Sequence, residues 1–161
     1  MKAATSNEIK QELKELSGAK LMDLCLRLAR FKKENKELLT FLLFEADDLE
    51  TYLKNVKDEV DENFREVNTT SIYFAKKTIR KILRIVNKHI RYTGSKQAEA
   101  ELLIHFCKKL KELKIPFRKS NVLDKLFDAQ VKKIKAAIDT MHEDLQYDYI
   151  RALDGLQSYS Y

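Results

Sequence analysis

The sequence predicts an all-α fold of about six antiparallel helices, arranged as a bundle or as a short solenoid of helix pairs. Three observations support this fold class. Helix-breaking residues are rare, because the 161 residues include one Pro and three Gly. Apolar residues recur at intervals of three and four over most of the chain, the spacing of one helix face. The composition, 35% charged and 44% hydrophobic, is typical of a globular chain rather than a disordered one.

We expect a single all-helical domain over residues 1–156 and a frayed tail at 157–161. The N-terminal residues lack the apolar stretch of a signal peptide. The longest apolar run, residues 41–44, is much shorter than the roughly 18 residues of a membrane span. Two cysteines are too few for a disulfide framework, which indicates a reducing compartment. The prediction is therefore a cytoplasmic protein without membrane contact.

The first two predicted helices are short. Thr5 and Glu8 have the spacing of a capping box, and Gly18 suits the C-terminal end of the first helix. The second helix, residues 19–33, is apolar over more than half of its circumference, and Cys25 lies within that arc. Because so wide an arc contacts at least two neighbours, we place this helix at the centre of the fold with Cys25 in the core. Leu24→Ala or Leu28→Ala in this helix would then cost about 2–5 kcal/mol, as truncations of buried leucines do.

Two of the predicted helices are long and carry heptad-like seams. The first, residues 36–67, has Asn35 as its cap and a seam with steps of three and four. That seam is formed by Leu42, Ala46, Leu49, Leu53, Val56, Val60, Phe64 and Val67. A helix of this length would measure about 48 Å. Either its second half projects as an arm, or it kinks near Asp47 and Asp48. The second long helix runs from about residue 121 to Gly155.

The basic helix at residues 70–92 has the most distinctive pattern. Its apolar residues lie on one side at 100° per residue. The opposite side carries the cations Lys77, Arg80, Lys81, Arg84, Lys88 and Arg91. Residues 67–135 hold 18 basic and 5 acidic side chains, whereas residues 36–66 hold 4 basic and 10 acidic. A basic middle segment thus follows an acidic one.

This basic stripe has two interpretations. Lys and Arg on one helix face follow a nucleic-acid backbone well, so the six cations are candidate phosphate contacts of low sequence specificity. Alternatively, the stripe is solvated and partly neutralised by the acidic helix before it. A short connection places consecutive helices side by side. We expect the second interpretation, with nucleic acid as the alternative partner.

Catalytic and metal-binding motifs are sparse. His142 has Asp139 three residues before it, but a di-metal site of the ferritin type needs Glu-x-x-His on two helices. Cys107 lies at the edge of a predicted apolar face. The lysines beside it would lower the pKa of its thiol, which would favour a reactive cysteine. We nevertheless favour a semi-buried structural thiol. No phosphate-binding loop is present. One loop, after Pro116, is expected to expose Phe117 among cations. We predict no enzyme activity, no cofactor and no metal.

The order LSGAKLMDLCLRLARFKKENKELL, a long acidic segment, and YFAKKTIRKILRIVNKHIRYTGSKQAEAELLIHFC resembles a family of small all-helical bacterial proteins of unassigned function. The resemblance covers most of the chain and implies no activity or site. The predicted function is a non-enzymatic helical interaction module that binds a protein partner, or itself as a homo-oligomer, through its long seams. The alternative is a nucleic-acid-associated protein that uses the basic helix at residues 70–92.

Overall fold

The computed structural model describes residues 1–157, and 82% of them are helical with no strand among them. The all-α prediction is confirmed. Contacts divide the chain into two compact units, residues 1–45 (unit 1) and residues 46–161 (unit 2), which we describe separately. The single domain expected over residues 1–156 stays a prediction. Of the expected tail, residue 157 ends a helix, and residues 158–161 lie outside the described residues.

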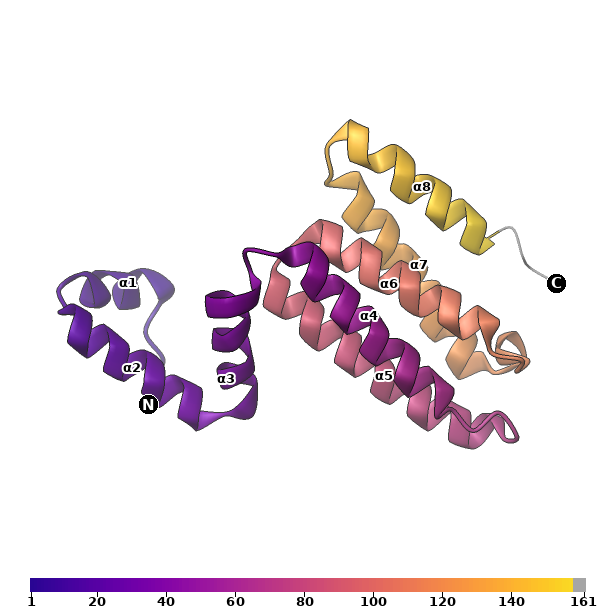
Figure 1. Cartoon of the computed structure of the whole chain (residues 1–161), viewed down its shortest axis with the longest axis horizontal. Coiled ribbons are helices and arrows are strands. Elements are labelled where there is room, and N and C mark those ends of the chain that lie inside the picture. Colours follow the sequence, from indigo (N-terminus) through magenta and orange to yellow (C-terminus); the bar gives the residue numbers. More distant parts are fainter. Residues whose placement is uncertain (158–161) are drawn as a thin grey trace. The chain divides into compact units, whose positions relative to one another are not determined.

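Unit 1 contains α1 (Ser6–Lys14), α2 (Gly18–Phe31), α3 (Lys33–Thr40) and a π-helical turn, η1 (Phe41–Glu45) (Figure 1). The predicted capping box is confirmed: the Glu8 N–H donates to Thr5 Oγ1 at 3.3 Å, and the Thr5 N–H donates to the Glu8 carboxylate at 2.7 Å. Gly18 was wrongly expected to end the first helix. The Ser17 hydroxyl caps α2, so Gly18 is the first residue of the second helix.

The long helix predicted at residues 36–67 is interrupted near Asp47 and Asp48, the position of the predicted kink. The chain leaves η1 at Glu45 and starts α4 (Leu49–Arg65) after a turn. Asp48 has a non-helical backbone, and its carboxylate accepts a hydrogen bond from the Thr51 N–H at 3.1 Å. Such an N-cap starts a new helix. Asn35 is not a cap; its side-chain amide donates to the Leu28 carbonyl oxygen at the end of α2.

Unit 2 is organised around one helix. It comprises α4, α5 (Ile72–Thr93), α6 (Lys96–Glu112), a 3₁₀ turn η2 (Phe117–Lys119), α7 (Asn121–Asp139) and α8 (Glu143–Gln157). Helix α6 contacts α4, α5, α7 and α8 (Figure 1). It therefore buries residues all round: Ala98, Ala100, Leu102, Leu103, Ile104, Phe106, Cys107 and Leu110.

The prediction that residues 19–33 form the central helix is wrong. Helix α2 belongs to unit 1 and has no buried residue, and Cys25 is exposed. A wide apolar arc shows that a helix can contact several neighbours, but unit 1 does not supply them. The cost of about 2–5 kcal/mol expected for truncating a buried leucine therefore applies to α6 residues such as Leu103, which is fully buried.

The C-terminal part of the heptad-like seam of the acidic segment lies inside unit 2, whereas its first residue, Leu42, is exposed in unit 1. Leu53, Val56, Val60 and Phe64 are all buried within unit 2, where α4 contacts α5 and α6. The second long helix is interrupted too. The Thr140 hydroxyl donates to the Ala137 carbonyl oxygen at 2.7 Å and closes α7, after which α8 begins. The described residues thus form eight α-helices instead of about six, and their antiparallel arrangement stays a prediction.

In the described part of the chain, no helix combines the length and apolar character needed to cross a membrane.

Candidate functional site

The burial of one face of α5 determines which side chains the helix presents to solvent. Ala75, Ile79, Ile82 and Val86 are fully buried where α5 contacts α4 and α6. Gly94 ends the helix in the left-handed conformation, with φ of 58°, which an L-residue adopts only with strain. Because the apolar face is fixed in the core, the opposite basic face points outward.

A groove of about 540 Å³ lies beside this basic face. Its lining residues come mostly from α5, and Leu126 comes from α7. The full set is Tyr73, Lys76, Lys77, Arg80, Leu83, Arg84, Asn87 and Leu126. We call it the α5 groove. Four of its side chains are cations, and none of the described side chains that line it is acidic.

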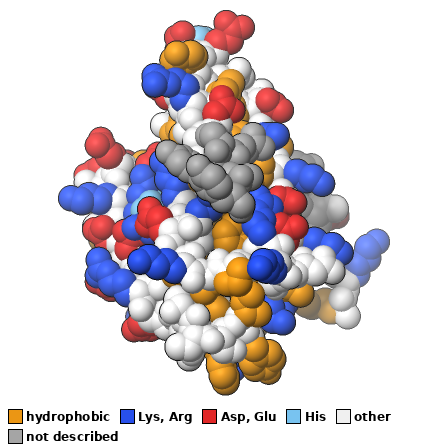
Figure 2. All heavy atoms as spheres, turned by 90° about the vertical axis from the view of Figure 1, so that its right-hand side faces the viewer, with side chains coloured by type: hydrophobic (Ala, Val, Ile, Leu, Met, Phe, Trp, Pro, Cys, Tyr) orange, Lys and Arg blue, Asp and Glu red, His pale blue; other side chains and the backbone are white. Residues whose placement is uncertain are grey.

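Elsewhere on unit 2, charges of both signs are mixed. Figure 2 shows Lys and Arg side chains beside Asp and Glu side chains over much of the face that it views. Three predicted site residues, Lys77, Arg80 and Arg84, line the α5 groove; Lys81, Lys88 and Arg91 belong to α5 but do not line it. The structure therefore divides the predicted stripe into two groups of three.

Five of the six predicted cations form no ion pair within residues 1–157. They are Lys77, Arg80, Lys81, Arg84 and Arg91. Lys88 is not among these free cations. The acidic helix therefore makes no direct ion pair with these five cations. Arg80 and Arg84 keep all their guanidinium donors available on the groove wall.

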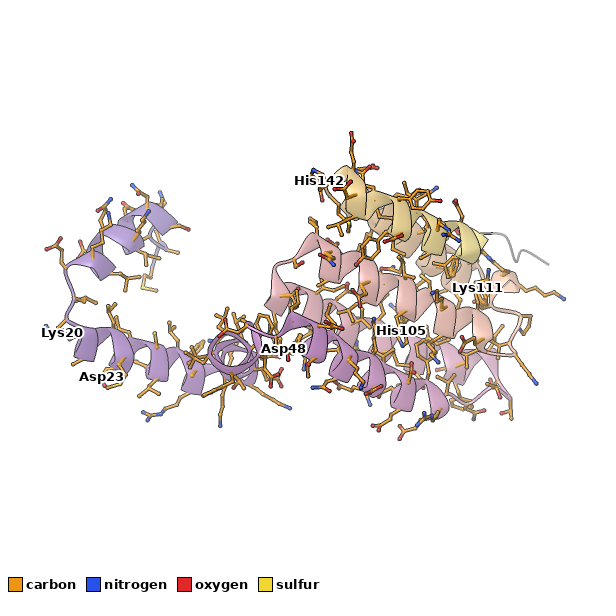
Figure 3. All side chains as sticks on the ribbon, turned by 45° about the horizontal axis from the view of Figure 1, so that its top comes forward. Lys20, Asp23, Asp48, His105, Lys111 and His142 are labelled. Atoms are coloured by element: carbon orange, nitrogen blue, oxygen red, sulfur yellow. The ribbon has the colours of Figure 1, made fainter. Side chains whose placement is uncertain are left out.

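The acidic side chains of α4 instead contact histidines and lysines. Asp61 accepts from His105 Nε2 at 2.6 Å and lies 3.3 Å from Lys109 Nζ. Both partners belong to α6, on which Figure 3 labels His105. Burial opposes ionisation of Asp61, but the hydrogen bonds and charges of His105 and Lys109 outweigh it and lower the pKa of the carboxyl group. Glu59, also on α4, lies 3.3 Å from Nε2 of His89 on α5. The acidic side chains of α4 thus pair with both α5 and α6.

An exposed aromatic pair lies at the start of α5. The side chains of Tyr73 and Phe74 are 68% and 55% exposed, and their ring centroids are 5.4 Å apart in an edge-to-face arrangement. Lys76 Nζ lies 5.7 Å from the centroid of the Tyr73 ring. Tyr92, near the opposite end of α5, is buried. Phe74 was missed, although its position off the apolar face was visible at 100° per residue.

The remaining sequence candidates do not form a reactive site. Phe117 was expected to be exposed but is buried, and Arg118 lies over the ring of Phe127 while pairing with Asp124 at 2.6 Å. His142 is exposed at the start of α8. Among residues 1–157, no group of three or more His, Cys, Asp and Glu side chains is placed to hold a metal ion.

The Cys107 thiol is fully buried on α6. Burial raises its pKa to about 12, although the charges of Arg118 and Lys111 oppose the shift. The two lysines that follow it in sequence do not produce the lowered pKa considered from sequence. Because the thiolate is the nucleophilic form, this cysteine is structural.

A second polar hollow, of about 200 Å³, lies between α4, α6 and α8. Lys57 Nζ contacts Glu101 Oε1 at 2.5 Å, and the Tyr149 hydroxyl donates to Glu101 Oε2 at 3.3 Å. Burial, together with the negative charge of Glu101, raises the pKa of Tyr149. Tyr149 is therefore a protonated donor at neutral pH. Lys57 and Tyr149 both contact the Glu101 carboxylate, and these contacts join α4 and α8 to α6.

Comparisons with protein-family models, with curated proteins and with solved structures found no match to the chain. The functional argument therefore depends on the geometry of the α5 groove and of unit 1.

Proposed function

We propose that unit 2 binds nucleic acid through the α5 groove. The observation that supports this proposal is that Lys77, Arg80 and Arg84 line one groove and form no ion pair within residues 1–157. Phosphate oxygens are strong acceptors for Lys and Arg donors, and binding releases the counterions condensed on the phosphates. A cation already paired within the protein would contribute much less.

The length of the stripe favours a polymer of phosphates over a single anion. Lys77 and Arg84, which both line the groove, are seven positions apart on one helix, which corresponds to about 10 Å. Successive phosphates of one strand in duplex DNA are about 3.4 Å apart along the axis. The stripe can therefore contact several phosphates of one strand, while a free phosphate or a mononucleotide would use only part of it.

An anionic membrane surface fits the same charges less well. Amphipathic helices bind bilayers by inserting their apolar face beside the cations. In α5 that face is packed in the core of unit 2, where Ile79 and Ile82 are fully buried. Three of the cations also line a hollow rather than a flat surface. This shape suits a strand that lies in the groove.

Salt-dependent binding of the full-length chain to a labelled oligonucleotide of mixed sequence tests this proposal. We expect binding in the micromolar range or tighter at physiological salt, weakening steeply as salt rises. Arg80→Gln with Arg84→Gln should flatten the plot of log K against log salt by about 1.4–1.8, because each lost phosphate contact contributes about 0.7–0.9.

The matched control is Lys81→Gln with Arg91→Gln, which removes two other free cations from α5 but leaves the groove lining intact. In this control, the slope of log K against log salt should change by less than half of the change expected for Arg80→Gln with Arg84→Gln. Two results would contradict the proposal: dissociation constants weaker than about 100 μM for every oligonucleotide, or equally strong binding of polyglutamate at the same charge concentration.

A second candidate function is self-association, which a separate observation on unit 1 favours. The packing of unit 1 leaves large apolar side chains exposed: Met22, Leu24, Leu26, Leu28, Phe31, Leu42, Leu43 and Phe44. A further apolar hollow of about 290 Å³ lies between α2 and α3. The parts of the long seams that lie on α4 and α7 are buried inside unit 2, so unit 1 offers the apolar surface that a second copy could cover.

A further inference from the structure

We propose that the α5 groove prefers single-stranded nucleic acid to duplex, with a base stacking on the exposed rings of Tyr73 and Phe74. This inference rests on the proposed function and specifies its substrate class. Proteins that bind single strands combine a positively charged groove with aromatic side chains on which bases stack. On α5, the cations of the groove and the exposed aromatic pair lie next to each other.

The aromatic pair adjoins the phosphate-binding part of the groove. Tyr73 itself lines the groove, and Lys77 follows it by one helical turn on the same face. Both rings of the pair are more than half exposed. A strand whose phosphates lie along Lys77, Arg80 and Arg84 would therefore reach these rings with its next base.

The interior of the groove suits bases as well as phosphates. Leu83 and Leu126 provide an apolar surface between α5 and α7, and Asn87 provides an amide that can donate to and accept from a base edge. A volume of about 540 Å³ is that of a small-molecule pocket. It can hold one or two nucleotides of a strand, but not a double helix.

A duplex cannot use the same features. Its bases are stacked on one another and show only their edges in the grooves, so Tyr73 and Phe74 would find no base face except at an end. The groove is a recess, whereas reading of the major groove requires a helix that projects into the DNA. The cations alone would bind duplex through its phosphates, without any contribution from the rings.

Fluorescence anisotropy of the full-length chain tests the preference, with a labelled single strand of about 12 nucleotides compared with the same sequence as a blunt duplex at equal salt. We expect the single strand to bind at least about fivefold more tightly. Tyr73→Ala with Phe74→Ala should abolish that preference and leave the salt slope unchanged. Tyr73→Phe should retain it, because the ring that stacks is kept.

The matched control is Tyr147→Ala on α8, where a tyrosine of similar exposure (65%) also lies under a cation, Arg151, but away from the α5 groove. It should leave both affinities unchanged. The inference is overturned if the unmodified chain binds duplex as tightly as single strand, or if the double variant keeps the preference while its circular dichroism is unchanged. Failure to bind either form would overturn the proposed function as well, so the two failures are distinguishable.

Discussion

At the scale of single residues, burial decides the chemistry of the two cysteines. Cys107 is enclosed by the neighbours of α6, and its thiol has a pKa of about 12. At pH 8 about one molecule in ten thousand would carry the thiolate there. Cys25 is exposed on α2. The two thiols therefore differ in access as well as in ionisation.

We expect a thiol-specific reagent near pH 8 to modify one cysteine per native chain and both cysteines in denaturant. The reactive one should be Cys25, because its side chain is exposed. Cys25→Ser should therefore leave the native chain unreactive. Cys107→Ser should leave one reactive thiol. Equal reaction rates of both cysteines in the native chain would show that α6 is more open than its packing indicates.

At the scale of elements, a polar cluster between α4 and α6 makes stability depend on pH. Asp61 contacts His105 and Lys109, which lower the pKa of its carboxyl group despite partial burial. A lowered folded-state pKa contributes stability above the unfolded value, about 3.9, and that contribution is lost as pH falls through the folded value. Acid should therefore weaken the attachment of α4 to α6.

Asp61→Asn should reduce the free energy of unfolding at about pH 5, and the difference from the unmodified chain should shrink toward about pH 3. Urea unfolding at the two pH values measures this. Asp58→Asn, one turn earlier on α4, is the control, because Asp58 is exposed and has no ion pair within the described residues. A difference for Asp61→Asn that stays constant with pH would mean that the ion pairs are unimportant.

At the scale of the whole molecule, the two units differ in what they expose. Unit 2 buries its apolar seams and exposes a basic face. Unit 1 exposes apolar side chains on α2 and η1, and its charges are nearly balanced, with nine basic and seven acidic residues. Two copies of a surface with almost no net charge do not repel each other, and such a surface does not favour a strongly charged partner. An apolar surface of this kind therefore suits contact with a second copy of the same chain. A stable dimer would bury about 800 Å² on each copy.

Sedimentation velocity should show a dimer of the full-length chain at micromolar concentration, and Leu28→Lys with Phe31→Lys should convert it to a monomer. Both side chains are exposed, so the substitutions should leave circular dichroism unchanged. The control is Leu145→Lys with Ile150→Lys, which changes exposed apolar residues on α8 of unit 2 and should leave the dimer intact. A monomeric unmodified chain at about 100 μM would contradict self-association.

Much of the candidate site was predictable, because it lies on one helix. The 100° spacing of α5 places the six cations opposite the apolar face, and it also places Tyr73 and Phe74 off that face. Leu126 of α7 was not predictable as a lining residue. It reaches the groove through the packing of α7 in unit 2, and no pattern within α5 or α7 indicates that proximity.

The sequence by itself determined the features that depend on near neighbours in the chain. The Thr5–Glu8 capping box and the buried face of α5 are examples, since helix periodicity and local hydrogen bonds set both. Tertiary structure alone decided that α6, and not α2, is central in its unit, and that Asp61 contacts His105 while Arg80 and Arg84 form no ion pair within residues 1–157. The physical reason is that periodicity records how apolar a face is, whereas burial and ion pairing depend on which distant segment covers it.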